Sequence, residues 1–193
     1  MPKGEEKMPP SVRITKEDII KTAMELVRKN GEDAINARAI ASALGCSTQP
    51  VFSNFASMVE VREAVIEAAE ALCAKYSKEE MERGEYPVYK ASGMGYIRFA
   101  KEERELFRLV YMCDRSAEQM AQEDRNFSES VALVSKNTGL GEDEARVFHL
   151  EMWALVYGIA TMYATGFLDL DSELVSRMLS DAYLGMKKQY GME

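Results

Sequence analysis

Proline and glycine, the residues that interrupt helices, are scarce in this chain. Proline occurs five times and glycine 12 times in 193 residues, and three of the prolines lie within the first ten positions. Because these residues are the strongest local breakers of helix, the rest of the chain can form helix almost without interruption. The scarcity predicts an all-α fold.

Histidine and cysteine are also scarce, which excludes most catalytic and metal-binding arrangements. His149 is the only histidine, and a lone histidine in a mostly apolar helical pattern is more often a core residue than a catalyst. No serine or cysteine stands in a nucleophile motif, and no glycine-rich phosphate loop follows a strand. The three cysteines are widely spaced and have no histidine partners at metal-ligand spacing. We therefore expect no enzyme activity, no catalytic residue, no metal site and no cofactor, and free thiols in a reducing cytoplasm.

The long apolar runs of secreted and membrane proteins are missing as well. The first residues contain no apolar segment, so we expect no signal peptide. The most apolar stretch, 152–168, has 17 uncharged residues, whereas a transmembrane helix needs about 20. A helix that is apolar all round must be covered on every side. We expect its own domain to cover one side of this stretch and a second copy of the chain to cover the other.

Positive charge is in deficit, with 24 Lys and Arg against 32 Asp and Glu, a net charge of −8. The deficit is uneven, because residues 1–62 carry nine basic and eight acidic residues, net +1, whereas residues 63–193 carry 15 and 24, net −9. A nucleic-acid partner is therefore not excluded. A DNA-contacting face would depend on a few well-placed cations, Arg13, Lys16 and Arg38, and not on bulk charge.

Residues 36–55, NARAIASALGCSTQPVFSNF, contain two short helical patterns joined by a glycine turn. Asn36 is a good N-cap for the first pattern, and Gly45 can adopt the left-handed conformation that ends it. Ser47 can cap the second pattern, in which Pro50 falls in the first turn, where its missing N–H needs no partner. We expect Val51, Phe52 and Phe55 to face the first helix, and Thr48, Gln49, Ser53 and Asn54 to point outward.

Two short helices with a glycine-containing turn, the second of which offers polar side chains outward, are typical of a helix-turn-helix. In such a motif the second helix enters the major groove of DNA. Spacing alone leaves an alternative open, because many helical proteins contain a tight corner of this kind. In the alternative, the chain is a helical small-molecule-binding protein or enzyme, and its corner is only structural.

The motifs around this corner resemble, in their order, the DNA-binding domain of the TetR/AcrR family of bacterial transcription regulators. The similar segments are IIKTAMELVRKNG at 19–31, RAIASALGCS at 38–47, and VFSNF at 51–55, followed by Ser57 and Glu60. The resemblance covers roughly the first third of the chain. It implies a sequence-specific DNA-binding protein with a separate regulatory domain.

Two positions depart from that family's pattern. Phe52 stands where tyrosine is usual, so a hydroxyl that would bond a phosphate is missing, and Met58 stands where a phosphate-contacting lysine is common. The departures lower the expected DNA affinity without changing the expected fold. The residues expected to contact DNA bases or phosphates are Arg38, Ser47, Thr48, Gln49, Pro50, Phe52, Ser53 and Asn54.

The arrangement of apolar, capping and turn residues along the sequence divides the chain into three parts. We expect a disordered tail at 1–13, a three-helix domain with the helix-turn-helix at 14–60, and a helical bundle for regulation and dimerisation at 61–193. Helix starts and stops are marked by capping and turn residues. The expected helices run from Thr15 to Gly31, through the two patterns above, from Ser57 to about Met81, over 89–102, 104–112 and 116–137, from Glu142 through the apolar stretch, and over 172–190.

Aromatic residues and methionines are frequent on the apolar faces of the second domain. They could line a cavity in which tyrosine hydroxyls and the Trp153 N–H orient a ligand. Such sets usually describe an ordinary core, but the resemblance implies an effector-binding domain, and we expect a small apolar or amphipathic effector. The residues expected to bind it are Tyr96, Phe99, Phe107, Tyr111, Phe127, Trp153 and Tyr157.

The leading interpretation is a cytoplasmic, ligand-responsive transcriptional repressor that binds a palindromic operator in double-stranded DNA. One short helix reads few bases, so two copies held about one DNA turn apart are needed. The resemblance implies a homodimer through the last two helices, and this agrees with the need to cover the apolar stretch. We expect no membrane partner.

Overall fold

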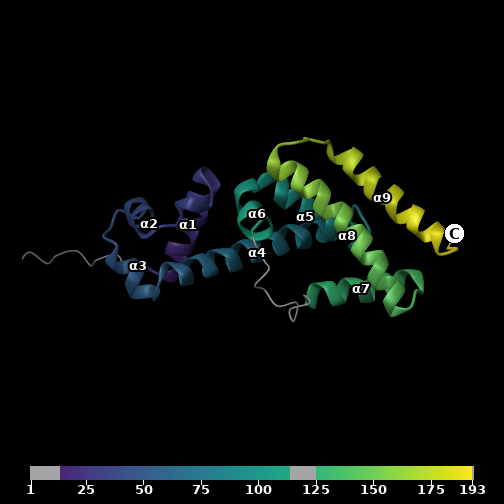
Figure 1. Cartoon of the computed structure of the whole chain (residues 1–193), viewed down its shortest axis with the longest axis horizontal. Helices are drawn as coiled ribbons and strands as arrows, with labels where there is room; N and C mark the ends of the chain where they lie inside the picture. The colour runs from purple at the N-terminus through teal and green to yellow at the C-terminus, as the bar shows by residue number, and fades with distance from the viewer. Residues whose placement is uncertain (1–13, 114–124, 193) are drawn as a thin grey trace, which may run out of the picture.

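The structure, a computed structural model, describes residues 14–113 and 125–192, and every regular element within those ranges is helical (Figure 1). The all-α prediction is confirmed. The expected tail at 1–13 and the first part of the helix expected at 116–137 lie outside the described residues. The helices are α1 (Lys16–Asn30), the short η1 (Glu32–Ala34), α2 (Ala37–Ala43), α3 (Gln49–Asn54), α4 (Met58–Arg83), α5 (Val88–Glu102), α6 (Arg104–Tyr111), α7 (Arg125–Thr138), α8 (Glu142–Thr165) and α9 (Ser172–Gln189).

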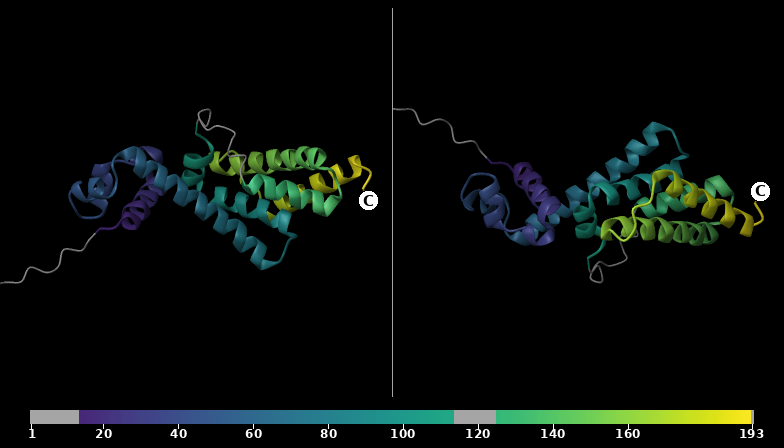
Figure 2. Two further views of the ribbon diagram at one scale, coloured as in Figure 1. Left: turned by 90° about the horizontal axis from the view of Figure 1, so that it is seen from below. Right: turned by 90° about the horizontal axis from the view of Figure 1, so that it is seen from above.

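The molecule is elongated, with a small head at one end and a larger helical bundle at the other (Figures 1 and 2). The head consists of α1, α2, α3 and the start of α4, and the bundle contains α5 to α9. With 26 residues, α4 is about 39 Å long at ~1.5 Å per residue and runs from the head into the bundle. It ends at Arg83, close to the expected Met81, because Gly84 adopts the left-handed conformation with a φ of 68°.

Local capping sets the helix starts in the head. Thr15 and Asp18 form the expected capping box of α1, in which the Asp18 N–H donates to Thr15 Oγ1 at 3.1 Å and the Thr15 N–H donates to the Asp18 carboxylate at 3.0 Å. Asn36 Oδ1 accepts the Ala39 N–H at 2.9 Å and so begins α2. The apolar faces of these helices then meet in one core. The buried residues of that core include Ile19, Ala23, Val27, Ile40, Val51 and Phe55.

In the bundle, α5 lies between α4 and α8. The approach of α5 to α4 is closest at Gly95, where an added Cβ would lie 2.4 Å from the Cα of Ser77. One turn further on, Arg98 Nη1 donates to the buried carboxylate of Glu80 at 2.6 Å. These contacts hold the second half of α4 on α5, whereas its first half belongs to the head.

One face of α8 is buried and the other is exposed. The buried face packs on α5, α6, α7 and α9. On the opposite face, the side chains of Val147 and Leu150 are 48% and 42% exposed, and Ala154, within the apolar stretch, is exposed too. The chain's own domain thus covers one side of the apolar stretch, as expected, and leaves the other side open. Among the described residues, no helix is long and apolar enough to cross a lipid bilayer.

Candidate nucleic-acid interface and aromatic cluster

A tight turn joins α2 and α3. Gly45 adopts a left-handed φ of 67° in this turn, as its place in the sequence predicts. α3 begins at Gln49, one residue later than a cap at Ser47 would place it. Thr48 precedes the helix, has a helical backbone conformation and forms no side-chain cap. Pro50 is the second residue of α3 and lies in the first turn, as expected. Ser47 and Gln49 are exposed, whereas Thr48 and Pro50 are half-buried.

One expectation about α3 is wrong. Val51 is fully buried and Phe55 is 3% exposed, as expected for residues that face the other helices of the head, but Phe52 is 51% exposed. Successive residues of an α-helix point about 100° apart. A face that buries Val51 and Phe55, four residues apart, therefore turns Phe52 toward solvent. Phe52 belongs to the outward surface, beside the exposed Gln49 and Ser53.

Some polar side chains of this surface already form hydrogen bonds within the protein, and others do not. Arg38 and Gln49 are exposed, and neither side chain forms a hydrogen bond or ion pair with any residue in the described part of the chain. The Ser53 hydroxyl donates to the Gln49 carbonyl oxygen of the preceding turn at 2.9 Å. Asn54 Nδ2 donates to the carbonyl oxygen of Ile14 at 3.3 Å and so ties α3 to the start of α1. Arg38 and Gln49 are thus available to a partner, whereas the Asn54 amide stabilises the head.

Two other cations of the head are paired with carboxylates. Lys16 Nζ lies 3.3 Å from Glu60 Oε1, and Arg62 Nη2 lies 2.5 Å from Glu32 Oε2. Each pair places a negative charge beside the positive one. Because Arg38 forms no such pair in the described residues, it provides a positive charge at the start of α2 that a phosphate can pair with.

Six of the seven residues expected to bind a ligand form one aromatic cluster in the bundle. Phe99 and Phe107 are fully buried at its centre. Trp153, which is 48% exposed, stacks on Tyr157 with ring centroids 5.3 Å apart. The cluster therefore runs from the core between α5 and α6 to the surface of α8. Its members are Tyr96, Phe99, Phe107, Tyr111, Trp153 and Tyr157, and neighbouring ring centroids are 5.1 to 6.4 Å apart.

The polar groups of the aromatic cluster are the tyrosine hydroxyls and the Trp153 N–H, and none of its members is charged. The Tyr157 hydroxyl donates to the Tyr111 carbonyl oxygen at 2.8 Å. Burial raises the pKa of the Cys73 thiol on α4, which lies near the Tyr111 hydroxyl, to about 11. Cys73 is therefore protonated at neutral pH. This environment suits an uncharged or weakly polar ligand.

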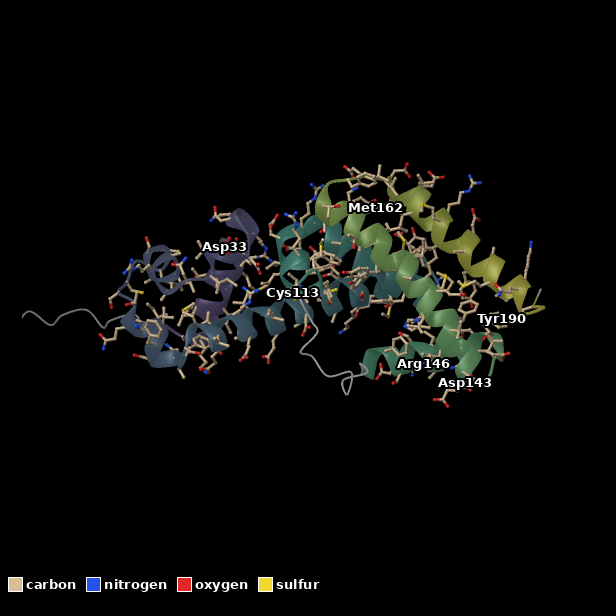
Figure 3. The ribbon with its side chains drawn as sticks, viewed as in Figure 1. Asp33, Cys113, Asp143, Arg146, Met162 and Tyr190 are labelled. Atoms are coloured by element: carbon tan, nitrogen blue, oxygen red, sulfur yellow. The ribbon has the colours of Figure 1, made fainter. Side chains whose placement is uncertain are left out.

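Phe127 lies apart from the aromatic cluster, on α7. Its ring centroid is 4.8 Å from that of His149, whose Nδ1 is 2.8 Å from the Tyr89 hydroxyl oxygen. Burial lowers the pKa of His149, so its ring is neutral at pH 7. Phe127 also lines a shallow groove of about 320 Å³ that includes Arg146, and Figure 3 shows Arg146 where α7 and α8 lie side by side. The described residues contain no group of His, Cys, Asp and Glu that could hold a metal ion.

A contact between the head and the bundle joins Arg28 of α1 to Glu103, which lies between α5 and α6. Arg28 Nε and Nη2 donate to the two Glu103 carboxylate oxygens at 2.7 and 2.9 Å. The Glu103 N–H donates to the Phe99 carbonyl oxygen, and the Glu103 carbonyl oxygen accepts the Phe107 N–H, both at 2.8 Å. Glu103, which pairs with Arg28 of the head, is therefore hydrogen-bonded through its main chain to Phe99 and Phe107, the two central residues of the aromatic cluster. No pattern in the sequence indicates this pair, because each residue looks like an ordinary charged residue at a helix end.

Comparisons with known proteins agree with this arrangement. Residues 89–182 match the family model described as tetracyclin repressor-like, C-terminal domain. Among solved structures, the crystal structure of a TetR-like transcriptional regulator from Rhodococcus sp. RHA1 is similar over 92% of this chain and 97% of that chain, with a TM-score of 0.66 and 13% sequence identity. None of the curated proteins compared with the chain matches it. The structural match shows the same fold along almost the whole chain, and the family model identifies the bundle. Residues 89–182 thus match a tetracyclin repressor-like C-terminal domain, and the chain as a whole has the fold of a TetR-like transcriptional regulator.

Proposed function

We propose that this protein is a ligand-responsive, sequence-specific DNA-binding repressor of the cytoplasm, and that a small apolar or amphipathic effector releases it from DNA. The observation that carries the proposal is the helix-turn-helix surface, where Arg38 at the start of α2 and Gln49 at the start of α3 are exposed and make no side-chain bond within the described residues. A side chain in this state can contact DNA without first breaking a bond in the protein. The match of residues 89–182 to a tetracyclin repressor-like C-terminal domain supports the same role.

In the proposed complex, α3 lies in the major groove. Recognition helices contact base edges with their N-terminal residues, and Gln49 is the first residue of α3. Glutamine binds adenine through two hydrogen bonds, and an aromatic ring such as Phe52 can pack on the methyl group of thymine. Arg38 binds a phosphate of the backbone. The other members of the proposed contact surface are Ser47, Thr48, Pro50, Ser53 and Asn54.

The protein acts as a homodimer through α8 and α9. Leu150 of α8 and Leu174 and Leu184 of α9 are 42%, 42% and 53% exposed, a pattern that a second copy of the chain would cover. An added Cβ at Gly158 of α8 or Gly185 of α9 would meet nothing within 4 Å. The backbone of a partner helix can therefore approach closely at these positions. Two heads then read the two halves of a palindromic operator in double-stranded DNA.

The effector binds at the aromatic cluster. Its rings pack against one another, so a ligand must displace some of them. A movement of Phe99 or Phe107 moves Glu103, because both are bonded to its main chain, and Glu103 moves α1 through Arg28. The effector thereby changes the separation of the two heads and shifts the population away from the form that binds DNA.

The test is a selection of bound sequences from random double-stranded DNA, followed by affinity measurements on the selected site. We expect a palindromic site. Gln49→Ala should weaken binding by about 10-fold or more and relax the preference at one base pair, whereas Arg38→Ala should weaken binding to all sequences evenly. The sequence preference therefore separates the two roles.

Lys136→Ala is the control, because Lys136 is exposed on α7, at the opposite end of the molecule from α3 (Figure 1). It should bind the selected site like the natural protein. Equal affinities of the Arg38, Gln49 and Lys136 variants would contradict the proposed DNA surface. A chain that binds a ligand tightly but selects no DNA would favour a small-molecule-binding protein whose corner is structural.

A further inference from the structure

Lys90 of α5 carries a positive charge that no described carboxylate neutralises. Its Nζ donates to the hydroxyl oxygens of Ser176 at 2.7 Å and Ser180 at 2.8 Å, both on α9. The same atom lies 4.6 Å from the centroid of the Tyr86 ring. All four residues are half-buried. The ammonium group therefore sits between two helices and is partly shielded from water.

The missing carboxylate distinguishes Lys90 from other half-buried cations of the chain. Arg28, Arg62 and Arg98 each pair with at least one glutamate. No Asp or Glu in the described residues forms an ion pair with Lys90, although acidic residues outnumber basic ones by 32 to 24. Burial lowers the pKa of Lys90, because the charge has lost part of its hydration without gaining a counter-charge. Such a charge is costly unless a partner supplies the opposite sign.

The group formed by Lys90, Ser176 and Ser180 also contains unused hydrogen-bond donors. A serine hydroxyl has one donor and two lone pairs, so Ser176 and Ser180 can each accept from Lys90 and keep their own proton for another acceptor. No acceptor in the described part of the chain takes either proton. The ammonium group has three N–H donors, and two are used. Three donors and one positive charge are thus gathered between α5 and α9.

We propose that Lys90, Ser176 and Ser180 form a binding site for a small carboxylate. A carboxylate carries one negative charge, which matches the single ammonium group, and it accepts several hydrogen bonds without donating any. The Tyr86 ring, 4.6 Å from Nζ, provides an apolar surface for the carbon atoms of the ligand. The site shares no residue with the aromatic cluster and is independent of effector binding there.

A carboxylate bound at this site ties α9 to α5. Within α9, Val175 and Leu179 are the buried residues, and Met178, Ala182, Tyr183 and Met186 pack on the core while they remain partly exposed. A ligand that binds the folded chain and not the unfolded chain raises stability by mass action. Carboxylate binding should therefore raise the unfolding temperature and slow hydrogen exchange in α9.

The experiment uses the full chain and sodium acetate, with sodium chloride at equal ionic strength as the reference. We expect about 100 mM acetate to raise the unfolding midpoint by roughly 2–4 °C and to slow amide hydrogen exchange in α9. Lys90→Met should abolish both effects. Lys78→Met is the matched control, because the Lys78 side chain is 75% exposed and pairs with Glu82. It should respond to acetate like the natural chain.

A second variant, Ser176→Ala with Ser180→Ala, keeps the charge and decides the question if Lys90→Met does not fold. This double variant should lose most of the acetate response. An unchanged response in either variant would overturn the proposal, and so would a response of the natural chain no larger than that to chloride. A response to inorganic phosphate but not to acetate would overturn the assignment to a carboxylate.

Discussion

Gly95 is the residue at which the backbones of α4 and α5 come closest. An added Cβ would lie 2.4 Å from the Cα of Ser77, 2.7 Å from its nitrogen and 2.8 Å from the carbonyl oxygen of Tyr76. All three are backbone atoms, so no side-chain rotation can relieve the contact. We therefore expect Gly95→Ala to lower the free energy of unfolding by about 2–3 kcal/mol, although alanine normally stabilises a helix interior by ~1 kcal/mol relative to glycine. Urea unfolding followed by circular dichroism measures the difference.

Gly93→Ala is the matched control for this substitution. Gly93 lies in the same helix, α5, but an added Cβ there would meet only side-chain atoms, 3.2 Å from Val156 Cγ2 and 3.8 Å from Leu179 Cδ1. Its stability should stay within about 1 kcal/mol of that of the natural chain, because the higher helix propensity of alanine offsets a small movement of these side chains. Equal stabilities of the Gly95 and Gly93 variants would show that α5 does not approach α4 as closely as the structure indicates.

The residues of the candidate DNA surface could be predicted where a single helix face decides their position. The four-residue spacing of Val51 and Phe55 is enough to bury both. The apolar character of Phe52 predicts the same face, but Phe52 points about 100° away from Val51 and is 51% exposed. The bond from Asn54 to the Ile14 carbonyl oxygen depends on where α1 begins in space. No pattern within the helix-turn-helix carries that information.

Among the elements, α1 packs on α6, and the ion pair of Arg28 and Glu103 joins it to the corner between α5 and α6. The Arg28 and Glu103 side chains are 30% and 14% exposed, and two hydrogen bonds join them. Hydrogen bonds to charged groups contribute about 1.5–3 kcal/mol. We expect a double-mutant cycle of Arg28→Ala and Glu103→Ala, measured by unfolding, to give a coupling free energy of about 1–2 kcal/mol.

The pair of Arg62 and Glu32 is the comparison for that cycle. It connects α4 to η1, and its side chains are 39% and 54% exposed. Exposed pairs contribute between 0 and about 1 kcal/mol because water and salt screen them, so its coupling should be the smaller of the two. Equal couplings in the two cycles would remove the physical basis for a relay from the aromatic cluster to the head through Glu103.

Helix boundaries could be predicted closely because the groups that set them are local. Thr15 begins α1, Asn36 begins α2 and Ser57 begins α4, each through its own side chain. The contact between Arg28 and Glu103 could not be predicted, because the two residues are 75 positions apart in the sequence. From the sequence alone, glutamates closer to Arg28 are equally good candidates for its partner. The same arginine also bonds to Glu25, three positions away, at 2.8 Å.

In the molecule as a whole, the charges that favour and oppose DNA binding lie in different parts. Residues 1–62 have a net charge of +1 and residues 63–193 a net charge of −9. The bundle therefore does not attract DNA, and a single nearly neutral head neutralises few phosphates. In the proposed function, useful affinity requires two heads on one operator. Dimerisation should control DNA binding as strongly as the residues of α3 do.

Leu150 tests this dependence, because it is 42% exposed on the outward face of α8. Glutamate is a good helix former, so Leu150→Glu should leave the fold intact, but an unpaired charge buried in the interface is costly. We expect Leu150→Glu to raise the dimer dissociation constant by about 100-fold, a cost of roughly 2.7 kcal/mol, and to weaken operator binding in parallel.

Val88→Glu is the control, because Val88 is 54% exposed on α5, outside the last two helices, and it should change neither quantity. Sedimentation at micromolar concentration measures the association. A Leu150→Glu protein that remains dimeric would place the interface elsewhere, and one that is monomeric but binds the operator with full affinity would show that one head is enough.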